Sequence, residues 1–201
     1  MSTRSFRNDK GVALIEFCII LPLLVVMVFA IIDFGRLIQA RLIITNVTRE
    51  GGNLASRDIN SGNDLISMLQ SSASSLDSAC GSNPLNQCGR IYISTIEAGL
   101  TPGKPTPVIS VQHPQVRAGN LDVQSGIKAG ATNLGLTKKL YDHLVFKQVN
   151  QTADINGVTV VETFYKYRPI TPLPRFITNI LLNDGDGTII GSRAVFCTTG
   201  D

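Results

Sequence analysis

One long apolar run dominates the hydrophobic pattern of this chain. Between Val12 and Ile32 the only charged residue is Glu16, and the next charge is Asp33. A helix that crosses the hydrocarbon core of a bilayer needs roughly 20 apolar residues. The pattern therefore predicts a membrane-spanning helix. Pro22 lies inside it, either as a functional kink or as a proline that a membrane helix tolerates.

The helical pattern continues beyond the apolar run. Apolar and small residues recur there at alternating spacings of three and four, which places them on one stripe of a helix. The members of this stripe are Leu37, Ala40, Ile44, Val47, Gly51 and Leu54. We therefore predict one helix from about residue 13 to residue 57, with its stripe covered by the domain that follows. Gly51-Gly52 is a weak point at which this helix could end or bend.

The rest of the chain alternates between short helical and extended patterns. A second helix is predicted from Asn63, a good N-cap residue, to Ser78, and another over Leu134–Phe146. Strand patterns are found at Arg90–Glu97, Pro107–Gln112, Val158–Arg168 and Thr188–Cys197. Residues 113–130 are ambiguous, 174–182 suggest a helical turn, and 183–187 form a tight turn. This order predicts the α+β class, with a long helix packed on a small antiparallel sheet.

The charges set an orientation and exclude one class of partner. The formal net charge is +3, of which the basic leader, residues 1–11, contributes +2. The remainder has no basic patch for nucleic acid. Positive flanks stay in the cytoplasm, so residues 12–57 would anchor the chain and residues 58–201 would form the outer domain. A cleaved secretory signal is the alternative, but the apolar run exceeds the usual 7–15 residues and lacks a small-x-small site at its far end.

The cysteines and histidines offer little chemistry. Outside the apolar run, Cys80 and Cys88 are the nearest pair and the predicted disulfide, while Cys197 is an alternative partner for either. His113 and His143 are isolated from any recognisable nucleophile. The acidic turn before Thr188 resembles the start of a calcium loop, but Val195 replaces the glutamate that a loop counted from Asp184 requires. We predict no metal, no cofactor and no enzymatic activity.

A short motif joins the leader to the apolar run. Gly11 ends the basic leader, and Glu16 follows five residues later, next to Phe17. Cleavage after Gly11 would leave Val12 as the new N-terminus. A carboxylate in a membrane is costly unless it is paired, and the amine of Val12 in a neighbouring subunit is a suitable partner. The alternative is a glutamate that the helix dipole favours at a helix start.

Residues 8–58 resemble the N-terminus of TadE-like proteins, pilin-like components of the tight adherence (Flp) pilus system. The motif residues Gly11, Glu16 and Phe17 carry the resemblance, together with Ile20-Leu21-Pro22. The later stretch FYKYRPITPL, residues 164–173, is also similar. The resemblance implies processing by a prepilin peptidase between Gly11 and Val12. It also implies a minor pilin or pseudopilin, because the chain is much longer than the major Flp pilin.

The resemblance also implies partners and a location. The partners are the major Flp pilin, a companion minor pilin, the prepilin peptidase, the inner-membrane assembly platform and the lipid bilayer. The location is the bacterial inner membrane, with the outer domain in the periplasm. The residues predicted for helix–helix assembly are Glu16, Pro22, Leu37, Ala40, Ile44 and Val47. The rival hypotheses are an unprocessed, membrane-tethered binding module and, with less support, a tethered enzyme. Asp33, Arg36 and Arg41 are expected to mark the outer membrane boundary or, alternatively, to dock a partner helix.

Overall fold

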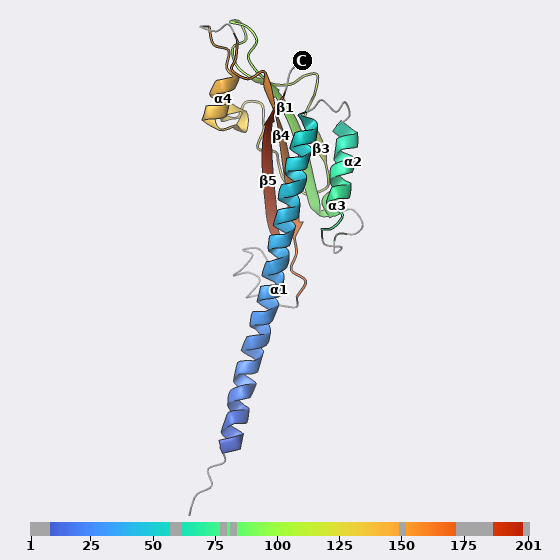
Figure 1. Ribbon diagram of the computed structural model, residues 1–201, viewed down its shortest axis with the longest axis vertical. Coiled ribbons are helices and arrows are strands. Elements are labelled where there is room, and N and C mark those ends of the chain that lie inside the picture. Colours follow the sequence, from blue (N-terminus) through green and yellow to red (C-terminus); the bar gives the residue numbers. More distant parts are fainter. Residues whose placement is uncertain are drawn as a thin grey trace, which may run out of the picture.

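A computed structural model of the chain describes residues 9–56, 62–76, 80, 84–148, 152–171 and 187–198. A long helix stands out from a small domain that packs on its C-terminal half (Figure 1). The helices are α1 (Asp9–Ala55), α2 (Gly62–Ser72), α3 (Pro84–Cys88), the 3-10 helix η2 (Thr132–Gly135) and α4 (Lys138–Leu144). The strands are β1 (Gly89–Glu97), β2 (Val108–Ile109), β3 (Val116–Ala118), β4 (Gly157–Tyr167) and β5 (Thr188–Cys197).

Helix α1 has two halves that differ in their surroundings. Its N-terminal half is uncovered, so that Val12 is 67 % exposed and Leu23 is 71 % exposed. The helix continues without interruption through Pro22, and Figure 1 draws this half without a sharp bend. Helix α1 is also the one helix among the described residues that is long and apolar enough to cross a membrane. The predicted long N-terminal helix is therefore confirmed.

The strands form one antiparallel sheet. Its order is β2-β1-β4-β5, and β3 pairs with the same strand β1 as β2 does. In the centre of the sheet Ile91 of β1 is paired with Thr163 of β4, and Thr163 is paired with Ser192 of β5. Side chains alternate between the two faces of a strand, so this register aligns one apolar face across the three long strands. The predicted α+β fold with a small antiparallel sheet is confirmed.

The first face of the sheet packs against α1 and α2. Its fully buried residues come from the helices and from the odd-numbered positions of β1 and β4. They include Ile44, Leu65, Leu69, Ile91, Val161 and Tyr165. The stripe predicted on α1 therefore has the cover that it needs. Full burial of such a side chain contributes roughly 1.5–3 kcal/mol, so this core holds the domain on the helix.

The second face of the sheet packs under α4, η2 and the loop before them. Its apolar part joins Ile96, Val158 and Val160 to Leu136 and Leu144. Glu162 lies on the same face, and its side chain is only 4 % exposed. Its carboxylate accepts hydrogen bonds from Arg193, at 2.7 Å from Nη2, and from the backbone N–H of Gly126. This buried charge is thus neutralised within the chain.

The two adjacent glycines of α1 allow close packing. A Cβ atom at Gly51 would lie 2.9 Å from Leu69, and one at Gly52 would lie 2.3 Å from the ring of Phe196. The helix continues through both residues and ends at Ala55. These glycines therefore admit α2 and β5 to the helix surface, a role that we did not predict.

Other boundaries differ from the sequence-based expectations. The helix predicted over Leu134–Phe146 is broken, because Asn133 and Leu134 have left-handed backbone angles, φ 53° and φ 56°. It is replaced by η2 and the short α4. Helix α2 stops at Ser72, six residues before the predicted end, and β2 retains only two residues. The predicted turns at 174–182 and 183–187 fall largely or wholly outside the described residues.

Candidate functional site

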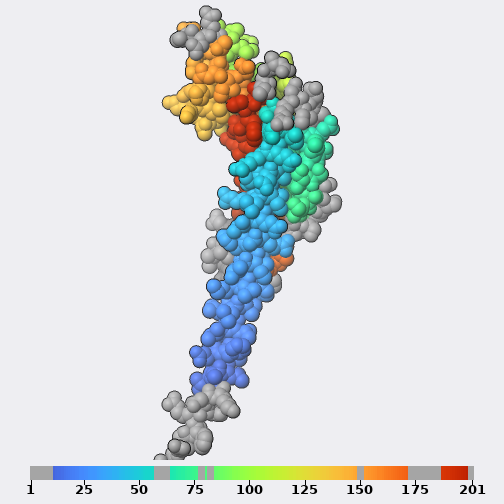
Figure 2. Space-filling view, in the orientation of Figure 1, coloured from blue at the N-terminus to red at the C-terminus, as the bar shows by residue number. Residues whose placement is uncertain are grey.

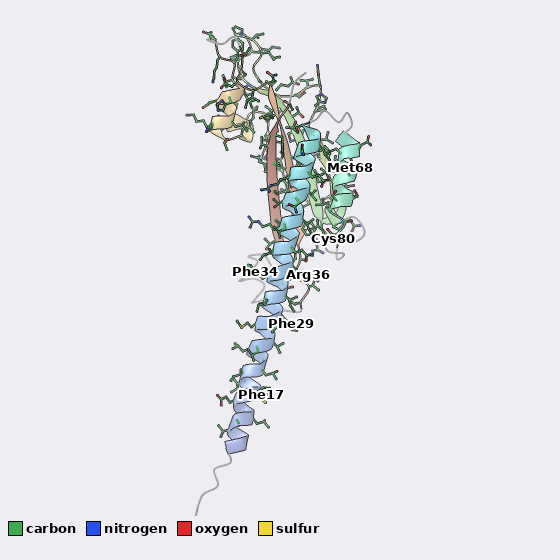
Figure 3. All side chains as sticks on the ribbon, viewed as in Figure 1. Phe17, Phe29, Phe34, Arg36, Met68 and Cys80 are labelled. Carbon is green, nitrogen blue, oxygen red and sulfur yellow. A yellow bond between two sulfur atoms is a disulfide. The ribbon has the colours of Figure 1, made fainter. Side chains whose placement is uncertain are left out.

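The predicted processing motif lies at the uncovered end of α1. A side chain at Gly11 would meet no atom within 4 Å, and Phe17, labelled in Figure 3, is 60 % exposed. Glu16 is also exposed. Within the part of the chain that the structure describes, Glu16 has no hydrogen bond or ion pair. The motif is therefore open to another molecule, with one unpaired carboxylate on an apolar surface.

Asp33, farther along α1, is a carboxylate in the opposite environment. It is 8 % exposed. Its side chain accepts hydrogen bonds from the backbone N–H of Ile170 at 3.3 Å, from that of Thr171 at 3.4 Å and from the Thr171 hydroxyl. The Tyr167 hydroxyl donates to the Asp33 carbonyl at 3.0 Å. We call these four residues the Asp33 clasp, since they fasten the end of β4 to the helix.

The clasp unites two stretches that the sequence presents separately. Asp33 ends the apolar run, and Tyr167, Ile170 and Thr171 belong to the later FYKYRPITPL stretch. The expectation for Asp33 was a position at the outer membrane boundary. The structure shows that Asp33 also holds the segment after β4 through hydrogen bonds. The only hint of this in the sequence was a charged residue directly after the apolar run. The domain thus begins at the level where the apolar run ends.

Four residues predicted for helix–helix assembly lie against the chain's own domain. Ala40, Ile44 and Val47 are buried in the core between α1 and the sheet, and Leu37 packs against that core. Pro22 remains in the uncovered half. These four side chains are therefore occupied within the chain.

The opposite side of α1 carries an apolar surface that we did not predict. Phe34, Ile38 and Leu42 are spaced by four residues and are 61 %, 45 % and 59 % exposed. We call these three residues the outer facet. The signal was present in the sequence as a second apolar stripe beside the buried one, but helix periodicity alone does not say which stripe the domain covers.

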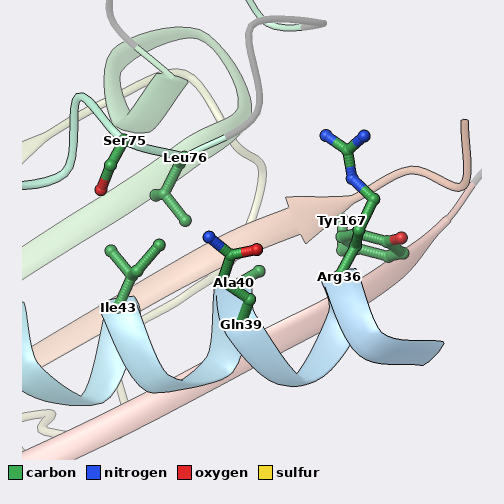
Figure 4. A pocket seen from close by; sticks show the side chains of 7 residues that line it. All are labelled: Arg36, Gln39, Ala40, Ile43, Ser75, Leu76 and Tyr167. Atoms are coloured by element: carbon green, nitrogen blue, oxygen red, sulfur yellow. The ribbon is translucent and has the colours of Figure 1, made fainter. Parts of the chain in front are cut away.

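A small cavity lies between α1 and the segment after α2 (Figure 4). Its volume is about 70 Å³, enough for a few water molecules. The lining residues are Arg36, Gln39, Ala40, Ile43, Ser75, Leu76 and Tyr167. They include one charged side chain and no pair of groups suited to acid–base chemistry. Arg36, expected at the membrane boundary, therefore borders the domain rather than standing apart from it.

The histidines and cysteines are placed as follows. His143 Nδ1 lies 2.7 Å from Asp154, which also binds Lys147. Hydrogen bonds from Lys147 and then His143 lower the pKa of Asp154.

Cys80 and Cys88 form a disulfide with a Cα–Cα distance of 5.9 Å, which closes the segment before β1. Cys18 and Cys197 are free and exposed. Among the described residues no cluster of three His, Cys, Asp or Glu could hold a metal.

The comparison with protein families gives a match to the TadE-like protein family over residues 11–53. This stretch of the chain is similar to the TadE-like family. The matched segment begins at Gly11 and ends two residues before the end of α1, so it covers the helix and not the sheet. Searches of curated proteins and of solved structures give no match. The TadE-like family is a family of structural proteins associated with the Tad pilus. Because the match lies on α1, this helix is the part of the chain that the family similarity concerns.

Proposed function

We propose that this TadE-like protein is a non-enzymatic minor pilin or pseudopilin in the biogenesis of a tight adherence pilus. One observation carries the proposal. Glu16 is the only charge in the apolar run, is exposed, and has no partner among the described residues. Its position five residues after Gly11 supports a role that begins with cleavage of the leader.

The energetics favour a partner in another subunit. A charged side chain at the centre of a membrane helix costs about 2.5–3.5 kcal/mol. Glu16 lies near the end of the apolar run, where this cost is smaller but still has to be offset. Cleavage after Gly11 by a prepilin peptidase creates the α-amino group of Val12. In our proposal this amine of one subunit pairs with Glu16 of its neighbour and fixes their axial register.

The proposed location follows from charge and redox chemistry. The basic leader stays in the cytoplasm, α1 spans the bacterial inner membrane, and the sheet domain lies in the periplasm. The disulfide between Cys80 and Cys88 suits that oxidising compartment. The proposed partners are the major Flp pilin, a companion minor pilin, the prepilin peptidase, the assembly platform and the surrounding lipid.

Two substitutions in the natural host test the proposal. Gly11→Val should leave the leader in place, because a β-branched side chain is added beside the cleaved bond. Glu16→Ala should insert normally but lower the yield of pili at least tenfold. Glu50→Ala is the matched control, since Glu50 is an exposed glutamate on the same helix beyond the apolar run. Mass spectrometry of the purified chain and quantification of sheared pili provide the readouts.

Opposite results would favour the rival hypothesis. If Gly11→Val and Glu16→Ala both gave wild-type pili, neither cleavage nor the carboxylate would matter. The chain would then be better explained as an unprocessed, membrane-tethered binding module of the cell envelope.

A further inference from the structure

The segment that follows β4 lies at the level where the apolar run of α1 ends. Asp33 is the first residue after this run, and its carboxylate accepts hydrogen bonds from the backbone N–H groups of Ile170 and Thr171, at 3.3 and 3.4 Å. The Cα–Cβ bonds of a helix tilt toward its N-terminus, so this carboxylate lies toward the run. Figure 1 shows the chain continuing past β4 alongside α1, in the direction of its uncovered half. The Asp33 clasp therefore fixes the height of this segment along the helix.

The apolar run has the length of a bilayer core. From Val12 to Ile32 the helix rises by about 31 Å, and the hydrocarbon core is about 30 Å thick. Each leaflet adds a headgroup layer of about 5–7 Å. With the run across the core, Asp33 lies at the boundary between the core and the headgroups, and Ile170 lies beside it. This placement rests on the span of α1 across the membrane that the proposed function includes, but not on cleavage of the leader or on a partner for Glu16.

The residues at this height have the chemistry of a membrane interface. Phe34 and Ile170 are apolar and are 61 % and 48 % exposed. Arg36 and Arg168 are exposed as well, and Arg168 makes no hydrogen bond or ion pair among the described residues. Arg36 lines the small cavity of Figure 4 together with Tyr167, the residue before Arg168. We call Phe34, Arg36, Arg168 and Ile170 the domain base.

A phospholipid surface suits this combination of side chains. An arginine can lay its methylene stem on apolar surroundings while its head remains among polar groups, and its guanidinium binds a phosphate through two parallel hydrogen bonds. Figure 2 shows the orange atoms at the end of β4 at the lower edge of the domain, beside the blue helix. Lipid is the occupant that continuity favours, because the apolar run directly below the domain base would itself be surrounded by acyl chains.

We propose that the domain base is a second membrane contact, in which Arg36 and Arg168 bind the phosphate groups of anionic phospholipids. In this contact Ile170 packs against the part of the acyl chains nearest the headgroups. The domain cannot then lift away from the bilayer without exposing Ile170 to water. Because the Asp33 clasp joins the domain base to the helix, the same contact sets the direction in which α1 tilts.

Brominated phospholipids test the contact in vesicles that contain the full chain and no other protein. The chain has no Trp, so one introduced Trp reports on one position through quenching by bromine. Ile170→Trp should be quenched most strongly by bromines near the headgroup, and Leu23→Trp, in the middle of the apolar run, by bromines deeper in the acyl chains. Val111→Trp is the matched control and should keep its fluorescence. Val111 is 89 % exposed and follows Ser110, which binds Thr95 near the opposite end of the sheet.

The choice of lipid tests the two arginines. In the Ile170→Trp chain, brominated phosphatidylglycerol should bind beside the Trp about fivefold more tightly than brominated phosphatidylcholine, since one arginine near an anionic surface contributes a factor of this size. The double substitution Arg36→Gln, Arg168→Gln should remove this preference. Arg117→Gln should retain it, because Arg117 is an exposed arginine in β3, away from the domain base.

The opposite results overturn the proposal. If Ile170→Trp were quenched no more than Val111→Trp, the domain base would not touch lipid. Equal binding of the two lipids, or a preference that survives Arg36→Gln, Arg168→Gln, would exclude the phosphate contacts. Arg168→Trp serves as a second reporter of the contact if urea unfolding shows that Ile170→Trp disturbs the domain.

The same samples separate this proposal from the proposed function. Quenching of Leu23→Trp without quenching of Ile170→Trp would contradict the second membrane contact alone. Quenching of Ile170→Trp that is unchanged in chains that retain residues 1–11, or that carry Glu16→Ala, supports the contact whether or not processing and pairing occur. Absence of quenching at Leu23→Trp would contradict both, because neither holds unless α1 is in the membrane.

Discussion

Two carboxylates of α1, Asp33 and Glu16, have opposite surroundings. Asp33, in the half that the domain covers, is buried and accepts hydrogen bonds from two backbone N–H groups and one hydroxyl. Glu16, in the uncovered half, is exposed on an apolar surface and has no partner within the described chain. A buried or membrane-embedded charge needs such partners. Asp33 has them in its own domain, so Glu16 is the one that requires another molecule.

The comparison separates folding from assembly along a single helix. The covered half of α1 is part of the core, since Ile44 and Val47 pack with α2 and the sheet. The uncovered half contributes nothing to that core. Substitutions in the covered half should therefore lower the free energy of unfolding. Substitutions in the uncovered half should alter assembly and leave the domain intact.

The largest effect on stability is expected at Gly52. Gly52→Leu forces a side chain into the position where the ring of Phe196 lies 2.3 Å from a Cβ atom, and overpacking of this kind costs roughly 1–3 kcal/mol. We expect the free energy of unfolding to fall by about 3 kcal/mol. It is measured by urea unfolding of the full chain in detergent, followed by tyrosine fluorescence because the chain has no Trp. Gly35→Leu is the control, since nothing lies within 4 Å of its Cβ position. Equal losses for both variants would contradict the packing role of Gly52.

A smaller effect is expected from the Asp33 clasp. Asp33→Ala leaves the N–H groups of Ile170 and Thr171 without their acceptor, and hydrogen bonds to charged groups contribute about 1.5–3 kcal/mol. We expect the free energy of unfolding to fall by about 2 kcal/mol and the amide of Thr171 to exchange faster with deuterium. Glu16→Ala should change neither quantity. If Glu16→Ala destabilised the domain as much as Asp33→Ala, the division of α1 into two halves would be wrong.

The smallest expected effect is a pH dependence of stability, which arises where α4 lies beside the segment before β4. Lys147 and then His143 hold the pKa of Asp154 below its ordinary value of 3.8. A lowered pKa in the folded state means that the stabilisation is present above pH 3.8 and is lost as the pH falls through the folded-state value. Asp154→Asn should therefore be less stable than wild type above this window, and the difference should close below it. Asp142→Asn, next to His143 in α4, should show no such change. A pH-independent difference for Asp154→Asn would contradict the ion pair.

The features that could be predicted from the sequence are those set by local periodicity. The long helix could be predicted from its apolar run and its apolar stripe. The strands β1, β4 and β5 could be predicted because apolar and polar residues alternate within their sequences. The clasp could not be predicted, because Asp33 and Thr171 are 138 positions apart and neither has a local pattern that names the other. The break at Asn133 and Leu134 was also missed, since left-handed angles at non-glycine residues depend on the packing around them.

The most direct test of the central claim is the intact mass of the natural protein purified from its own membranes. Our account assigns Glu16 to an amine that exists only after the leader is removed. It predicts a chain that begins at Val12 and retains the disulfide between Cys80 and Cys88. A mature chain that still carries residues 1–11 would contradict it, because Glu16 would then have no Val12 amine to meet.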